Sequence, residues 1–106
     1  MLALKRPLAL APFLLVLSGC QEHASRAECE ALLEHGVELA IRDKHPRAKP
    51  ALIASEKARR RRQPPGRQAI EACTHEVSKR ALACAMQASH IDDYERCLVI
   101  APWGFR

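Results

Sequence analysis

Five cysteines are distributed along this chain of 106 residues, and they constrain its fold more than any other feature. They stand at positions 20, 29, 73, 84 and 97. The first follows an uncharged apolar segment, whereas the other four lie among polar and charged residues. Because an odd number of cysteines cannot pair completely within one molecule, the role of Cys20 has to be settled first.

The N-terminal segment has the three-part layout of an export signal. Lys5 and Arg6 are followed by the uncharged stretch Pro7–Leu17, and the small residues Ser18 and Gly19 precede Cys20. An apolar stretch of about a dozen residues is too short to cross ~30 Å of hydrocarbon as a helix. We therefore expect residues 1–19 to be a removable signal peptide and not a retained transmembrane anchor.

The four residues Leu17-Ser18-Gly19-Cys20 resemble the lipobox of bacterial lipoproteins. The resemblance implies that a diacylglyceryl group is attached to the Cys20 sulfur and that the chain is cut before Cys20. It also implies a membrane anchor, and Gln21 in place of Asp implies the outer membrane of a Gram-negative envelope. The alternative is an ordinary secretory signal followed by an incidental cysteine.

Removal of residues 1–19 changes the interpretation of the basic charge. The segment contains Lys5 and Arg6 and no acidic residue, so its loss lowers the formal net charge from +5 to +3. The basic composition is thus partly an export feature. We expect no nucleic-acid partner for such an exported chain.

Cys29, Cys73, Cys84 and Cys97 remain for the mature protein. An even number of cysteines in a small exported domain predicts two disulfides. A hydrophobic core alone is only marginally stable below about 80–90 residues, which makes such cross-links expected.

The first half of the mature chain contains one clear helix and one uncertain segment. After a tether over 20–25, Ser25 and Glu28 form a capping box, and apolar residues at helical spacing predict a helix over 26–43 that stops before Pro46. Gly36 in that helix permits close approach of another helix. The segment 46–66 is predicted either as a short helix over 51–61 or as an irregular basic linker, ended by Gln63-Pro64-Pro65-Gly66.

The second half predicts a long helix and a short one. The helix over 67–89 carries a stripe with steps of three and four residues, formed by Ile70, Cys73, Val77, Ala81, Cys84 and Ala88. Asp92 is a suitable N-cap for a last helix over 93–100. Because no strand pattern is evident, we expect residues 26–106 to form an all-α, disulfide-stapled bundle of three or four helices.

Helix geometry selects one of the three possible cysteine pairings. Cys73 and Cys84 would lie about 16 Å apart along one continuous helix, but a disulfide needs Cα atoms within about 7 Å. Cys84 and Cys97 are equidistant from the turn near residues 90–91, so an antiparallel hairpin brings them together. We therefore predict Cys84–Cys97, which leaves Cys29–Cys73.

The residues give little support for catalysis or metal binding. Cys73 and His75 point about 200° apart on a helix, and the chain has no CxxC or HExxH motif. It also lacks a GxSxG motif. We expect no catalytic residue, no metal and no cofactor, and therefore no enzymatic activity.

Two further features of the sequence are candidates for binding. The run Arg59, Arg60, Arg61 and Arg62 is a candidate contact for anionic lipid head groups, with a solvated charge run as the alternative. Trp103 and Phe105 are expected to pack back over the helices, with an exposed partner-binding tail as the alternative. The sequence thus favours a membrane-anchored, noncatalytic envelope protein that serves a structural or protein-interaction role. The alternative is a small binding module for anionic lipid or a hydrophobic ligand.

Overall fold

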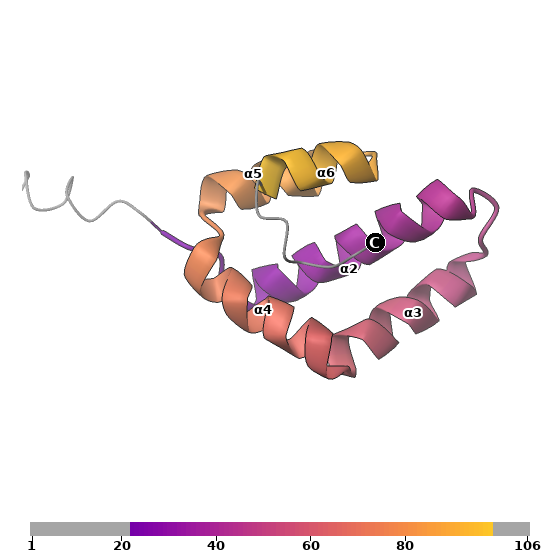
Figure 1. Ribbon diagram of the computed structural model, residues 1–106, viewed down its shortest axis with the longest axis horizontal. Helices are drawn as coiled ribbons and strands as arrows, with labels where there is room; N and C mark the ends of the chain where they lie inside the picture. The colour runs from indigo at the N-terminus through magenta and orange to yellow at the C-terminus, as the bar shows by residue number, and fades with distance from the viewer. Residues whose placement is uncertain (1–21, 99–106) are drawn as a thin grey trace, which may run out of the picture.

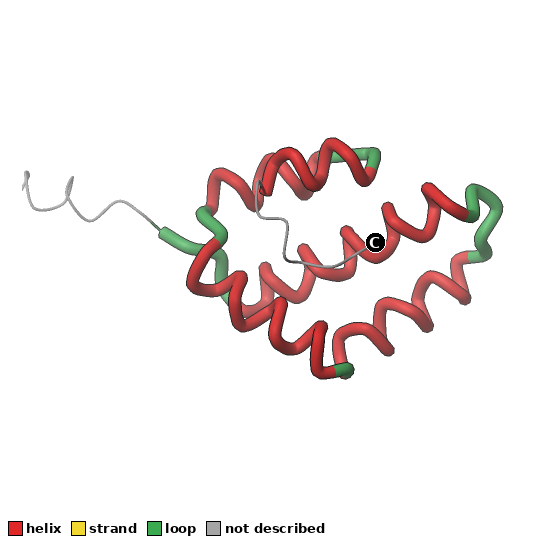
Figure 2. The backbone as a smooth tube through the Cα atoms, viewed as in Figure 1, coloured by secondary structure: helices red, strands yellow, loops and turns green. Residues whose placement is uncertain are grey.

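The computed structural model describes residues 22–98, which form a bundle of helices (Figures 1 and 2). The helices are α2 (Arg26–Lys44), α3 (Pro50–Arg62), α4 (Pro64–Glu76), α5 (Lys79–Gln87) and α6 (Ile91–Leu98). In Figure 1, α2 runs through the middle, the α3–α4 pair bends along one side of it, and the α5–α6 hairpin lies on the other. The expected all-α class with two disulfides is confirmed. The expected signal peptide, Cys20, Trp103 and Phe105 lie outside the described residues.

Helix α2 is the central element, and it begins as its sequence predicts. The Ser25 hydroxyl accepts the Glu28 N–H at 3.2 Å, and the Glu28 carboxylate accepts the Ser25 N–H at 2.9 Å. This reciprocal capping box is confirmed. The buried face of α2 contacts the other helices through residues at helical spacing: Cys29, Leu32, Leu33, Gly36, Val37 and Leu39.

Residues 46–66 are mostly helical, which settles the choice between helix and linker for this segment. Helix α3 occupies most of it, but the expected break over residues 63–66 was too long, because α4 already begins at Pro64. Proline suits the first turn of a helix, where its missing N–H would have no partner. Gly66 is required in that turn, since a Cβ at this position would overlap the carbonyl oxygen of Arg60.

The expectation of one continuous helix over 67–89 was wrong. Val77 has an extended backbone, and the Ser78 hydroxyl accepts the Ala81 N–H at 3.1 Å to cap a new helix. The freed backbone groups pair with the N-terminal segment: Ala24 N–H donates to Val77 O at 2.8 Å, and Lys79 N–H donates to Glu22 O at 3.1 Å. A short antiparallel bridge thus replaces part of the helical hydrogen bonding.

The break changes which residues of the predicted stripe are buried. Ile70, Cys73 and Val77 lie in the core as expected. Beyond the break, α5 buries Leu82 and Ala85 instead of Ala81 and Cys84. A β-branched residue followed by a serine was the local signal for this interruption.

Helix α6 begins earlier than predicted. It starts at Ile91, and the Asp92 N–H donates to His90 Nδ1 at 3.2 Å, so Asp92 is not the N-cap. The described part of the helix ends at Leu98, and the last two residues of the predicted range lie outside the described part.

Tyr94 joins the α5–α6 hairpin to α2. Its ring is fully buried, and its hydroxyl donates to the Leu32 carbonyl oxygen at 2.7 Å. A Cβ at Gly36 would come within 2.7 Å of the Tyr94 ring and hydroxyl, so the expected close helix approach at Gly36 is confirmed. His35 Nε2 adds a hydrogen bond to the Ala88 carbonyl oxygen at 2.9 Å.

Candidate functional site

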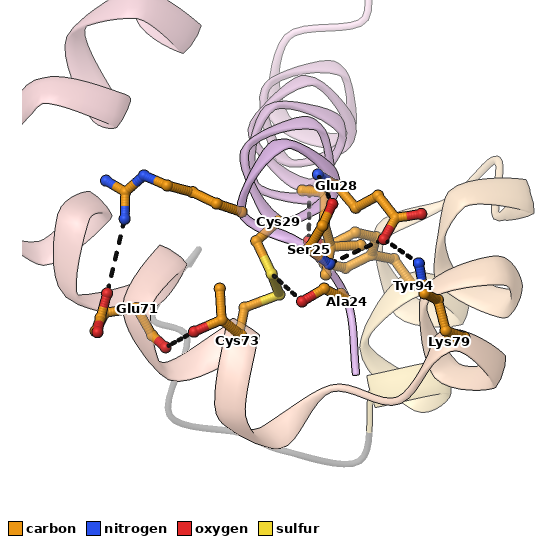
Figure 3. Close-up of a disulfide and its surroundings, with 11 residues drawn as sticks. Ala24, Ser25, Glu28, Cys29, Glu71, Cys73, Lys79 and Tyr94 are labelled. Atoms are coloured by element: carbon orange, nitrogen blue, oxygen red, sulfur yellow. Dashed lines mark hydrogen bonds and ion pairs between the residues drawn. A yellow bond between two sulfur atoms is a disulfide. The ribbon is translucent and has the colours of Figure 1, made fainter. Parts of the chain in front are cut away.

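The four cysteines are joined in the pairs that helix geometry predicts. Cys29 of α2 pairs with Cys73 of α4, with their Cα atoms 5.9 Å apart (Figure 3). Cys84 of α5 pairs with Cys97 of α6 across the hairpin, with a Cα separation of 5.6 Å. The break at Val77 places Cys73 and Cys84 in two different helices, so their separation does not depend on the continuous helix that was expected.

A network of charged side chains lies beside the Cys29–Cys73 disulfide. Glu28 accepts a hydrogen bond from Lys79 Nζ at 2.7 Å, and Arg26 lies 3.7 Å from Glu71 (Figure 3). The hydrogen bond from Lys79 lowers the pKa of Glu28 below its ordinary value, and the same bond raises the pKa of Lys79. These contacts link the start of α2 to α4 and α5, so this region has an evident structural role.

The arginines at residues 59–62 differ in their contacts. Arg59 forms an ion pair with Glu56 of its own helix at 2.6 Å, and Arg61 forms one with Glu34 of α2, also at 2.6 Å. Nearby, Lys57 Nζ donates to Glu38 at 2.7 Å, and this bond is the main reason that the pKa of Glu38 is lowered. Two of the four predicted lipid-contact residues are therefore engaged in ion pairs, and one of them, Arg61, links α3 to α2. Arg60 and Arg62 form no ion pair within residues 22–98.

Arg60 lines a groove between the second half of α2 and helix α3. The groove has a volume of about 280 Å³. Its walls are formed by eight residues: Val37, Ala40, Ile41, Lys44, His45, Leu52, Glu56 and Arg60. A second, more open hollow adjoins it and shares Lys44, His45 and Leu52, while adding Pro46, Arg47 and Ala48 from the turn. The arrangement is an apolar floor with basic side chains along its rim.

Sequence reasoning missed this groove, although one residue could have indicated it. Leu52 lies in a polar, basic helix, and 52% of its surface is exposed. The neighbouring Ile53 instead enters the protein interior. A lone large apolar residue on the outer side of a short basic helix was the available signal.

The described residues contain few other features that suggest chemistry. No group of three or more potential metal ligands occurs among residues 22–98. Burial raises the pKa of the Tyr94 phenol, which keeps its hydroxyl protonated as the donor to Leu32. Its role is accounted for by packing and hydrogen bonding. The groove is thus the strongest candidate binding site within the described residues.

No helix within residues 22–98 is long and apolar enough to cross a membrane. Comparisons of the whole chain with protein-family models, with curated proteins and with solved structures give no match.

Proposed function

We propose that this protein is a lipoprotein of the Gram-negative outer membrane, anchored through Cys20, whose helical bundle is a noncatalytic module for contacts with envelope proteins. The lipobox-like residues Leu17–Cys20 support the anchor. Two disulfides suit an oxidising, extracytoplasmic environment. In this proposal the lipid on Cys20 inserts into the membrane, and the surface of the bundle contacts protein partners.

The observation that carries this proposal is the fixed beginning of the bundle. The backbone of Glu22 and Ala24 is hydrogen-bonded to Lys79 and Val77. Only Gln21 lies between Glu22 and the proposed lipidated residue Cys20. Two residues span at most about 7 Å, so a lipid on Cys20 would hold this end of the bundle directly at the bilayer surface.

The anchor is tested by expressing the full chain in a Gram-negative host together with the Cys20→Ser variant. We expect the wild-type protein to fractionate with the outer membrane and to carry diacylglyceryl on Cys20 by mass spectrometry. The variant should lose both properties. Wild-type protein that is cut at another bond, or that carries no lipid, would contradict the anchor.

The interaction role is tested by crosslinking in intact cells, followed by affinity purification of the lipidated protein. We expect discrete protein partners whose crosslinks map to the surface of the bundle. Recovery of lipid without any protein partner would instead support the second candidate function.

That second candidate, a binding module for anionic lipid or a hydrophobic ligand, is favoured by the groove beside Arg60. It is tested with the Cys20→Ser protein and anionic vesicles. If the arginine run contacts lipid, a variant with serine at residues 59–62 should lose most vesicle association. Unchanged association would exclude that contact.

A further inference from the structure

We infer that the groove between α2 and α3 binds a free, single-chain anionic amphiphile, such as a fatty acid dissolved in the aqueous phase. The apolar chain would lie over Ile41 and Leu52, and the anionic head would meet Lys44 and Arg60. This inference rests on the second candidate function and specifies its ligand class and its site.

The floor of the groove suits an alkyl chain. Ala40 and Ile41 follow Val37 by three and four residues, so α2 presents them on the same face as Val37, and Leu52 of α3 also lines the groove. More than half of the Leu52 surface is exposed to solvent. Covering this apolar surface with an alkyl chain is favourable, because each buried methylene contributes about 0.8 kcal/mol.

The rim suits an anionic head group. Lys44 and Arg60 line the groove, and Arg47 lies in the adjoining hollow. Glu56 is the single carboxylate among the lining residues, and it already accepts two hydrogen bonds from the Arg59 guanidinium, at 2.7 and 2.8 Å. The charge left for a ligand is therefore positive, which favours an anion over a cation or a neutral amphiphile.

The size of the groove favours one chain over two. A methylene group is about as large as a water molecule, which occupies ~30 Å³. The hollow of about 280 Å³ therefore has room for roughly nine such groups. Within this groove, that corresponds to one chain of medium length.

The position of the groove favours a dissolved ligand over the bilayer. Its lining residues lie on the second half of α2 and on α3, and the α2–α3 turn lies at the opposite end of α2 from Ser25, where the helix begins (Figure 1). The 19 residues of α2 correspond to a length of about 28 Å. An anchor at Cys20 would hold the other end of the helix at the membrane, so the groove can point into the aqueous phase.

The test uses the oxidised mature chain from residue 20 with Cys20→Ser, and decanoate below its micelle-forming concentration as the probe. Binding is measured by calorimetry and by the amide NMR shifts of the groove residues. Decyltrimethylammonium and decyl maltoside have the same chain with a cationic or a neutral head. Vesicles of anionic phospholipid test whether the groove binds lipid of a bilayer in place of a dissolved amphiphile.

Two groove variants have matched controls on α5. Leu52→Asp is compared with Met86→Asp, because Met86 is the other exposed large apolar side chain among the described residues. Arg60→Gln is compared with Arg80→Gln, a basic residue at an exposed position. All four positions lie at the protein surface or at the rim of the groove. Circular dichroism verifies the fold of each variant, and a thiol assay verifies both disulfides.

We expect decanoate to bind with shifts confined to the groove and at least tenfold more tightly than either control amphiphile. Leu52→Asp should weaken binding by about tenfold or more and Arg60→Gln by about threefold, while both α5 variants bind as the parent does. Equal binding of all three head groups, equal loss in the α5 controls, or binding to vesicles without binding to decanoate would overturn the inference. Loss of the Cys20 anchor would leave this result unaffected, so the two proposals fail separately.

Discussion

The two disulfides connect regions of different character. Cys29–Cys73 joins α2 to α4 across 44 residues, and both cysteines are fully buried. Cys84–Cys97 closes a local hairpin across 13 residues, and Cys84 is exposed. The first bond therefore ties together distant parts of the core, whereas the second fixes a hairpin that contacts α2 through Tyr94. The Cys29–Cys73 disulfide therefore contributes to global stability, whereas the Cys84–Cys97 disulfide contributes to local order.

Removing the buried disulfide is expected to have the largest effect. In the chain-entropy model a loop of this length contributes about 4 kcal/mol, and the whole unfolding free energy of a small domain is only about 5–15 kcal/mol. We expect the variant with Cys29→Ala and Cys73→Ala to be largely unfolded at 37 °C. Circular dichroism and urea titration measure this, and an unfolding midpoint close to that of the parent would contradict it.

Removing the Cys84–Cys97 disulfide is expected to have a smaller and more local effect. The shorter loop contributes about 3 kcal/mol in the same model. With Cys84→Ser and Cys97→Ser, α5 and α6 should exchange amide hydrogens faster, while the α2–α4 region keeps its protection. Hydrogen exchange by mass spectrometry checks this. Uniform loss of protection across residues 22–98 would show that the hairpin is not a separate unit.

The contact between α2 and the hairpin can be broken without touching either disulfide. Gly36→Ala forces a methyl group against the Tyr94 ring, which should cost about 1–3 kcal/mol. Tyr94→Phe removes the hydrogen bond to Leu32 O and should cost about 1 kcal/mol. Urea unfolding of both variants gives these values. The opposite order of the two effects would argue against close packing at Gly36.

The Glu28–Lys79 ion pair, which also connects the two regions, should give the smallest effect. The pKa of Glu28 is lowered from 4.5 mainly by its hydrogen bond to Lys79. The ionised Glu28 carboxylate therefore stabilises the folded protein at neutral pH. This stabilisation is lost as the pH falls below 4.5, through the lowered native pKa. Glu28→Gln keeps the capping geometry and should reduce the acid dependence of the unfolding midpoint.

Glu76→Gln provides the control for that pH profile, because Glu76 is exposed and forms no ion pair within residues 22–98. Its stability profile should follow the parent between neutral and acidic pH. An equal change in both variants would show that the acid dependence reflects overall charge and not the Glu28–Lys79 bond.

The sequence predicted the elements whose signals are local. The capping box of Ser25 and Glu28 lies within four residues, and α2 begins where it indicates. The cysteine pairing was also predictable, because helical spacing and the turn near residue 90 restrict which sulfurs can meet. The capping box and the Cys84–Cys97 hairpin depend on short-range geometry, whereas the Cys29–Cys73 pair spans 44 residues and follows by elimination.

The Val77-Ser78 pair was only a weak local signal for the interruption, because the backbone groups that pair with the extended segment lie more than fifty residues away in the chain. Helical periodicity continued through Val77, and only pairing with Glu22–Ala24 made the extended backbone favourable. The groove was missed for a related reason. Its walls come from two different helices, α2 and α3, and a single-helix pattern does not reveal a groove between two helices.

The contrast between the two disulfides is tested most directly by graded reduction of the native protein. A soluble thiol is added stepwise, new thiols are alkylated, and non-reducing digestion identifies the links that remain. We expect Cys84 and Cys97 to be labelled first, while the 29–73 link persists until the protein unfolds. Labelling of Cys29 and Cys73 first or at the same rate, or recovery of a 73–84 link from the untreated protein, would contradict the account.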